Sequence, residues 1–221
     1  MGGTSAEVKM DSKTLQYYDG NAAEVAAKYD AIEQNEWRRL FQDSFKAGGR
    51  ILDIGSGSGR DLALLLEMGF DAYGCEPSEG MRWHCCQNYP ATTGRIYFHG
   101  LPLPENEDMG GPFDGMVCSA VFQHVPEAER ADAAFSLKRH LCEGGRLWIT
   151  VPDRRSGLNE EHRDDTGRLF HPVHPEYLVR LFAKQGFQLL NQWEEKDRLG
   201  RPGISWNSFL FERRDLTVKT A

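Results

Sequence analysis

The chain has 221 residues, of which 40% are hydrophobic and 27% are charged, and its formal net charge at pH 7 is −7. This length holds one domain with a sizeable core, and the composition is typical of a soluble globular protein. The acidic balance disfavours a nucleic-acid partner, because phosphate binding needs a basic surface. No run approaches the ~18 apolar residues of a membrane span. Residues 1–20 also lack the apolar core of a signal peptide, so we expect a cytoplasmic protein without a membrane partner.

The five cysteines are odd in number and fall within strand-like or helix-like patterns. This indicates reduced thiols, as in a cytoplasmic protein. His84, Cys85 and Cys86 are neighbours that would point to different faces of a helix. Because that spacing does not suit zinc ligands, we expect no metal site.

In chain order, residues 1–20 are mostly small and polar, and we expect a flexible segment there. Residues 21–47 carry apolar side chains at helical spacing, which predicts an N-terminal helical extension that ends at Gly48 and Gly49. From residue 50 onward, strand-like and helix-like segments alternate. Strands are expected at 51–54, 71–76, 96–99, 113–119 and 146–151, with helices at 60–67, 78–88 and 126–140 between them.

The C-terminal part predicts a helix over 175–183 and two successive strands over 187–193 and 206–212. The whole pattern indicates an α/β fold: a Rossmann-like, doubly wound sheet of about seven strands with helices on both faces. The sheet would be mostly parallel with an antiparallel last strand. Residues 21–215 would form a single domain, and 152–174 would be a long connection suited to a lid.

A glycine-rich corner follows the first of these strands. Gly55, Gly57 and Gly59 alternate, but Arg60 stands where a dinucleotide fingerprint has its last glycine. Asp53 lies just before the corner. An acid there would repel a pyrophosphate and would suit a ligand with an ammonium group.

Glu76 ends the second expected strand, where an acid accepts hydrogen bonds from ribose hydroxyls. The ligand would therefore carry a ribose and a cation but no phosphate chain. S-adenosylmethionine has these properties, because it joins adenosine to a sulfonium and a methionyl ammonium group.

Four sequence blocks, in the expected order, resemble the class I S-adenosylmethionine-dependent methyltransferases over about residues 20–215. They are 51–61, 73–78 with Met81, 113–119 with 124–126, and 141–147. The resemblance implies that Asp53 lies near the amino group of the donor, that Glu76 holds the ribose and that Met81 borders adenine. His99 stands where family members often have an acid, so we expect the backbone of Gly100 and Leu101 to recognise adenine.

The cofactor-binding residues that the resemblance implies extend from the N-terminal helices to the fourth strand. They are Tyr17, Tyr29, Asp53, Gly55, Ser56, Gly57, Gly59, Arg60, Glu76, Pro77, Met81, Gly100, Leu101 and Ser119. Tyr17 or Tyr18 would cap the donor site, or both would simply pack against the core.

The function expected from this resemblance is methyl transfer to a small-molecule acceptor by in-line displacement, driven by orientation and proximity. No residue has to be catalytic, because the donor is already activated. A non-catalytic S-adenosylmethionine-binding or interaction module with the same fold is the alternative. A protein or peptide methyltransferase and a nicotinamide oxidoreductase are further alternatives.

Three residues are candidates for contact with the acceptor: His124, Arg154 and His171. His124 follows the fourth strand and is a substrate contact or proton acceptor, or else a helix-start residue bonded to the backbone. The arginines of the 152–174 segment would clamp an acidic substrate or pair with the acids around them. The sequence leaves these choices, the acceptor and the oligomeric state open.

Overall fold

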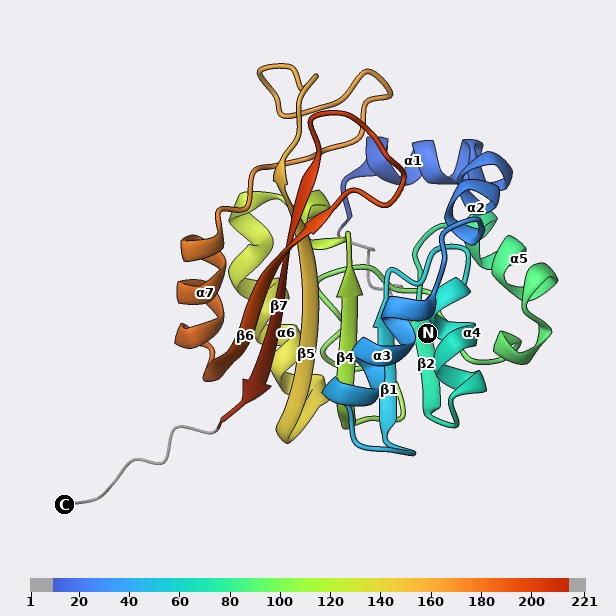
Figure 1. Ribbon diagram of the computed structural model, residues 1–221, viewed down its shortest axis with the longest axis vertical. Helices are drawn as coiled ribbons and strands as arrows, with labels where there is room; N and C mark the ends of the chain where they lie inside the picture. Colours follow the sequence, from blue (N-terminus) through green and yellow to red (C-terminus); the bar gives the residue numbers. More distant parts are fainter. Residues whose placement is uncertain (1–9, 215–221) are drawn as a thin grey trace, which may run out of the picture.

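The computed structural model describes residues 10–214, which form a seven-stranded sheet with helices on both faces (Figure 1). The strands are β1 Arg50–Ile54, β2 Asp71–Cys75, β3 Ile96–Tyr97, β4 Phe113–Ser119, β5 Leu141–Arg154, β6 Phe187–Lys196 and β7 Ser205–Arg213. The α-helices are α1 Ser12–Gly20, α2 Ala22–Asp30, α3 Asn35–Ser44, α4 Arg60–Glu67, α5 Glu79–Asn88, α6 Arg130–His140 and α7 Pro175–Lys184. Short 3₁₀ turns occupy Pro90–Thr92, Phe122–His124 and Glu127–Glu129. Among residues 10–214, no helix is long and apolar enough to cross a membrane.

The strand order is β3-β2-β1-β4-β5-β7-β6. Strands β1 to β5 pair in parallel, whereas β7 runs antiparallel between β5 and β6. This arrangement confirms the predicted fold class, including the antiparallel last strand. The order reverses between β1 and β4, and such a switch point opens a crevice at the carboxyl ends of the strands.

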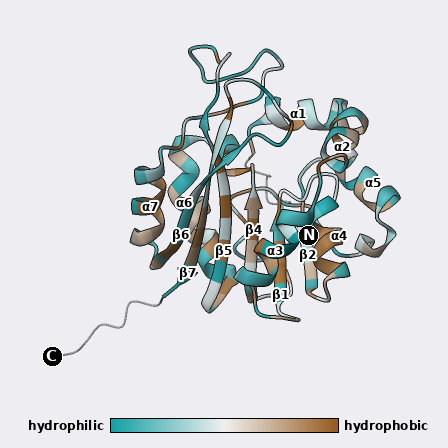
Figure 2. Cartoon of the chain, viewed as in Figure 1, coloured by the Kyte–Doolittle hydropathy of each residue, from teal (hydrophilic) through white to brown (hydrophobic). Residues whose placement is uncertain are grey.

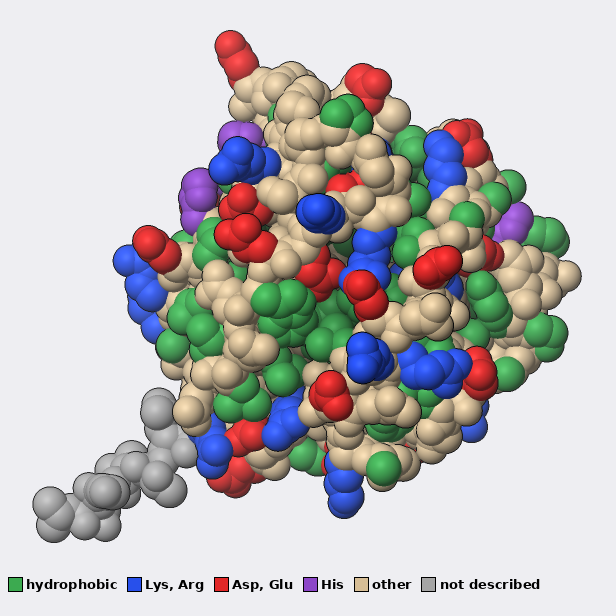
Figure 3. Space-filling model, in the orientation of Figure 1, with side chains coloured by type: hydrophobic (Ala, Val, Ile, Leu, Met, Phe, Trp, Pro, Cys, Tyr) green, Lys and Arg blue, Asp and Glu red, His purple; other side chains and the backbone are tan. Residues whose placement is uncertain are grey.

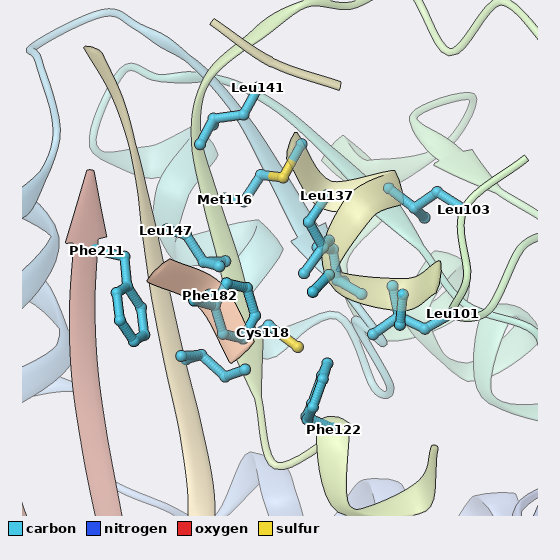
Figure 4. Close-up of a cluster of buried hydrophobic side chains, with 14 of the residues drawn as sticks. Leu101, Leu103, Met116, Cys118, Phe122, Leu137, Leu141, Leu147, Phe182 and Phe211 are labelled. Atoms are coloured by element: carbon cyan, nitrogen blue, oxygen red, sulfur yellow. The ribbon is translucent and has the colours of Figure 1, made fainter. Parts of the chain in front are cut away.

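Successive side chains of each central strand enter two different cores, because strand side chains alternate between faces. Ile51 contributes to the core under α3 and α4, while Leu52 faces the core under α6 and α7. Figure 4 shows the second core, where side chains of β4, β5 and β7 meet those of α6 and α7. The hydropathy colouring shows brown stretches along these strands and mostly teal loops above them (Figure 2).

The expected flexible segment 1–20 is wrong for its second half, because Ser12–Gly20 is helix α1; residues 1–9 lie outside the described part. Asp11 caps the helix by accepting from the Thr14 N–H at 2.9 Å. The same carboxylate pairs with Arg163 at 2.7 Å, and the buried Thr14 hydroxyl accepts from the Leu169 N–H at 2.9 Å. Helix α1 is therefore held by a segment distant in sequence, which local patterns do not show.

The 152–174 segment also differs from its prediction at one end, since its first three residues extend β5. Residues 155–174 contain no helix and lie at the top of the molecule in Figure 1, beside α1. We call 155–174 the roof loop. Asp164, Leu169 and Phe170 of this loop are buried, so it packs against the domain as an ordered element.

Candidate functional site

The glycine corner turns sharply between β1 and α4. Gly55, Gly57 and Gly59 all have positive φ, at 64°, 55° and 85°. At Gly55 a Cβ would lie 2.4 Å from the Val121 side chain, and at Gly59 it would lie 2.0 Å from the Cys85 sulfur. A side chain at either position would meet both a steric clash and backbone strain. Glycine therefore sets the shape of this corner.

Asp53 is the second-last residue of strand β1, just before the corner, and it is 2% exposed. Its Oδ2 atom is buried and has no hydrogen-bond partner among the described residues. Burial raises the pKa of this carboxyl group well above its usual range, and the negative charge of Asp61 raises it further. A buried carboxylate oxygen without a partner is suited to receive an ammonium group from a ligand.

Glu76 follows β2 and is 7% exposed. Its Oε2 accepts from the Gly57 N–H at 2.9 Å, and its Oε1 accepts from the Ser78 N–H at 2.8 Å. Burial raises the pKa of Glu76 to about 7, although these two backbone donors oppose the shift. Each carboxylate oxygen keeps acceptor capacity, so the side chain is fixed in place and still free to bind hydroxyl groups.

One cavity connects these two acids with the carboxyl end of β4 and with the roof of the molecule. Most of the predicted cofactor-binding residues line it: Tyr29, Asp53, Gly55, Ser56, Gly57, Arg60, Glu76, Pro77, Met81, Gly100, Leu101 and Ser119. Arg60 is held by Asp61 at 2.9 Å and by the Tyr29 carbonyl at 2.9 Å, so it ties α2 to α4. The structure thus brings together residues from five separate segments of the sequence.

Other predicted site residues lie outside the cavity lining: Tyr17, Gly59, Arg154 and His171. Gly59 instead allows α4 to pack against α5. The Arg154 side chain is 84% exposed beside Asp153. His171 faces Glu127, with its Nε2 3.4 Å from the carboxylate. Tyr17 packs its ring 4.3 Å from the Arg168 guanidinium, whereas Tyr18 is the tyrosine that lines the cavity.

His124 lies in the cavity wall just after β4, and its two ring nitrogens have different partners. The Leu169 carbonyl can only accept, so the proton sits on Nδ1, which donates to it. The Nε2 atom is then the acceptor, 3.3 Å from the Tyr18 hydroxyl. Burial lowers the pKa of His124 to about 4, so the ring is neutral at neutral pH. His124 is therefore bonded to the backbone and also lines the cavity, and its contact with an acceptor stays a prediction.

The chain turns into the cavity wall at Ala120, which has a φ of 57° without being glycine. This left-handed conformation costs roughly 1 kcal/mol or more. The Ala120 N–H donates to the Thr150 hydroxyl at 3.0 Å, which anchors the turn to β5. A strained residue thus forms part of the cavity wall and is held there by β5.

The far end of the cavity is lined by residues that the sequence did not bring together. They come from α3, the roof loop, the turn between β6 and β7 and the start of β7: Trp37, Arg155, Arg168, Phe170, Asp197, Arg198, Arg201 and Trp206. In Figure 1 the β6–β7 turn bends over toward α1. Asp197 organises this turn, accepting from Arg201 at 2.6 Å and from the Trp206 indole N–H at 3.0 Å. Sequence reasoning did not assign Arg155, Arg168 and Phe170 to the site because they lie in a segment without helical or strand periodicity. The segment around Trp206 instead has the pattern of a core strand.

A second, open groove borders the cavity along α3 and β6, and Trp37 and Arg198 line both. Figure 3 shows hydrophobic side chains at the centre of this face, between basic and acidic side chains. Across residues 10–214, no three His, Cys, Asp or Glu side chains are placed to hold a metal ion.

This fold, with its glycine corner and two buried acids, is that of a Rossmann-like protein whose cavity suits an adenosine ligand bearing an ammonium group. S-Adenosylmethionine fits both acids. Its ammonium group suits the unpartnered Oδ2 of Asp53, and its ribose suits the fixed carboxylate of Glu76. The sequence matches the methyltransferase domain family over residues 27–192, and the chain belongs to that family. It is a class I S-adenosylmethionine-dependent methyltransferase.

Three comparisons illustrate the relationship. An uncharacterized methyltransferase of Geobacillus sp. (strain WCH70) is 28% identical over 190 residues, which cover 79% of this chain and 83% of that protein. A protein-L-isoaspartate O-methyltransferase of Vibrio atlanticus is 27% identical over 154 residues, covering 65% and 66%. The crystal structure of Burkholderia thailandensis 1,6-didemethyltoxoflavin-N1-methyltransferase has a TM-score of 0.75 at 16% identity and covers 97% and 93%, which shows the shared fold. This chain spans between 58% and 90% of the length of eight such sequence relatives.

Proposed function

We propose that this methyltransferase acts on a small molecule bound between the donor end of the cavity and its roof. The single observation that carries the proposal is the way the roof is fastened. Helix α1 and the roof loop are joined by the Asp11–Arg163 ion pair at 2.7 Å and the Leu169–Thr14 hydrogen bond at 2.9 Å. A polypeptide acceptor would need an open groove beneath the roof, whereas a cavity covered on this side by α1 and the roof loop suits a small molecule.

In this proposal Asp53 receives the ammonium group of the donor and Glu76 receives its ribose hydroxyls. S-Adenosylmethionine supplies a methyl group on a positively charged sulfur, which keeps the electron pair of the broken carbon–sulfur bond when the acceptor's lone pair attacks the methyl carbon. The chain's own contribution is to orient the acceptor and exclude water at the His124 wall. His124 keeps its Nε2 unprotonated, and this atom accepts from the Tyr18 hydroxyl, which lines the same wall.

The comparison with the Burkholderia enzyme supports a small-molecule acceptor, because that structure contains 1,6-didemethyltoxoflavin together with S-adenosylhomocysteine. A protein acceptor is the second candidate, and the match to the Vibrio L-isoaspartate O-methyltransferase favours it. The two candidates predict labelled products of different size.

The test supplies the purified protein with S-adenosylmethionine labelled in the methyl group. A cell extract is separated by ultrafiltration, and each fraction is incubated with the protein. We expect label to pass to compounds of the low-mass filtrate, and Asp53→Asn to abolish most of that transfer. Label found only in acid-precipitable protein would overturn the small-molecule assignment in favour of the second candidate.

A further inference from the structure

Arg155 begins the roof loop and Arg168 lies in its second half, and both line the far end of the cavity. Their side chains are only 12% and 13% exposed. Both donate to the same carboxylate oxygen, Oδ2 of Asp164, at 3.0 Å and 2.7 Å. Two largely buried guanidinium groups therefore share one buried carboxylate, so this group of three side chains carries one more positive charge than negative charge.

The other charged side chains at this end are already matched within the described chain. Arg201 pairs with Asp197 at 2.6 Å, and Arg198 pairs with Glu36 at 2.5 Å and with Glu195 at 3.1 Å. The buried Nε of Arg155 has no hydrogen-bond partner among residues 10–214. Burial lowers the pKa of Arg155, and the neighbouring charge of Arg168 lowers it further. The positive charge of Arg155 is therefore disfavoured at this place, and a bound anion would stabilise it.

The aromatic side chains here do not form a cage for a cationic ligand, because the chain's own guanidinium groups cover them. The Arg155 Cζ lies 3.6 Å from the centroid of the Phe170 ring, and the Arg168 Cζ lies 5.1 Å from it. The Arg198 Cζ lies 4.2 Å from the Trp37 ring. An ammonium ligand would have to displace these cation–π contacts and would lie beside the guanidinium groups of Arg155 and Arg168.

We propose that the methyl acceptor carries an anionic group, such as a carboxylate on a flat molecule, and that Arg155 and Arg168 bind this group beside Phe170. The proposal rests on the small-molecule function proposed above, since it specifies the acceptor at the same site. Arginine suits this role because its planar donors match a carboxylate. The roof loop then determines specificity as well as closing the cavity.

The test uses benzoate as an anionic probe and benzamide as its neutral isostere, each titrated by NMR into the protein saturated with S-adenosylhomocysteine. We expect benzoate to bind about 10- to 100-fold more tightly than benzamide, the range that charge-assisted hydrogen bonds give. Arg155→Gln should remove this preference, and Arg155→Lys should retain part of it. The matched control is Arg154→Gln, because the neighbouring Arg154 is 84% exposed and outside the cavity lining, so it should leave the preference intact.

Equal binding of benzoate and benzamide by the wild-type protein would overturn the proposal without any variant. So would a benzoate preference that persists in both Arg155→Gln and Arg168→Gln. Calorimetry with S-adenosylhomocysteine checks that each variant is folded. If Arg155→Gln does not fold, Arg155→Lys takes its place in the comparison with the wild type. Label transfer to protein alone, with the benzoate preference present, would refute the small-molecule function while leaving the anion site standing.

Discussion

Replacement of Asp53 by asparagine separates ligand recognition from protein stability. The carboxylate is 2% exposed, its Oδ2 has no partner, and Asp61 and Glu76 both raise its pKa. Losing one partner of a buried charge pair costs about 2–4 kcal/mol, so Asp53→Asn should bind S-adenosylhomocysteine ~30- to ~1,000-fold more weakly. The unliganded variant should be at least as stable as the wild type, because it loses a buried charge that lies near two other acids.

Isothermal titration calorimetry measures the affinity, and thermal unfolding without ligand measures the stability. Asp132→Asn is the matched control, since this exposed residue of α6 undergoes the same change in charge outside the cavity lining. Its affinity and midpoint should match the wild type. If Asp53→Asn bound the ligand within about threefold of the wild type, the role given to Asp53 would be refuted.

Three further predictions concern the scaffold around the cavity. Gly59→Ala should lower the free energy of unfolding, measured in urea, by about 2–4 kcal/mol, whereas Gly144→Ala should lower it by about 1 kcal/mol. Both glycines have positive φ, but only Gly59 lacks space for a Cβ. Equal losses for the two variants would contradict this. Arg130→Met should lower the free energy of unfolding by about 2 kcal/mol or more, because buried Arg130 donates to three backbone carbonyls. The control Arg180→Met, at an exposed position, should change it by no more than about 0.5 kcal/mol. A loss for Arg130→Met below that of the control would refute this prediction. Glu76 has a pKa of about 7 against an ordinary 4.5, so the folded protein holds a proton that the unfolded chain releases, and stability falls as the pH rises through this window. The stability of the wild type relative to Glu76→Gln should therefore fall by about 2–3 kcal/mol between pH ~4.5 and ~8, and parallel pH profiles would exclude this coupling.

The sheet and the donor end of the cavity are the parts that the sequence predicts well. Alternation of apolar strands and amphipathic helices leads directly to the doubly wound order, and Asp53 and Glu76 fall at strand ends as expected. These features depend on local periodicity and on glycine chemistry, which a sequence displays directly. Their use in binding S-adenosylmethionine is our proposal, which the family of the chain supports.

The roof and the acceptor end depend on contacts between distant segments. Helix α1 is short and only weakly patterned, and its capping residue Asp11 pairs with Arg163 of the roof loop. Arg155 and Arg168 have acidic neighbours in sequence, so an exposed, self-paired loop was a reasonable interpretation. In the fold they share Asp164 alone and turn into the cavity, an outcome that depends on tertiary packing.

The account depends most on the direction in which the donor lies in the cavity. A crystal structure with S-adenosylhomocysteine tests this directly. We predict that its ammonium group will contact Oδ2 of Asp53, that its ribose hydroxyls will donate to Glu76, and that its sulfur will face the wall formed by His124. A ligand bound in the opposite direction, or bound away from these two acids, would contradict the assignment of the donor and acceptor ends.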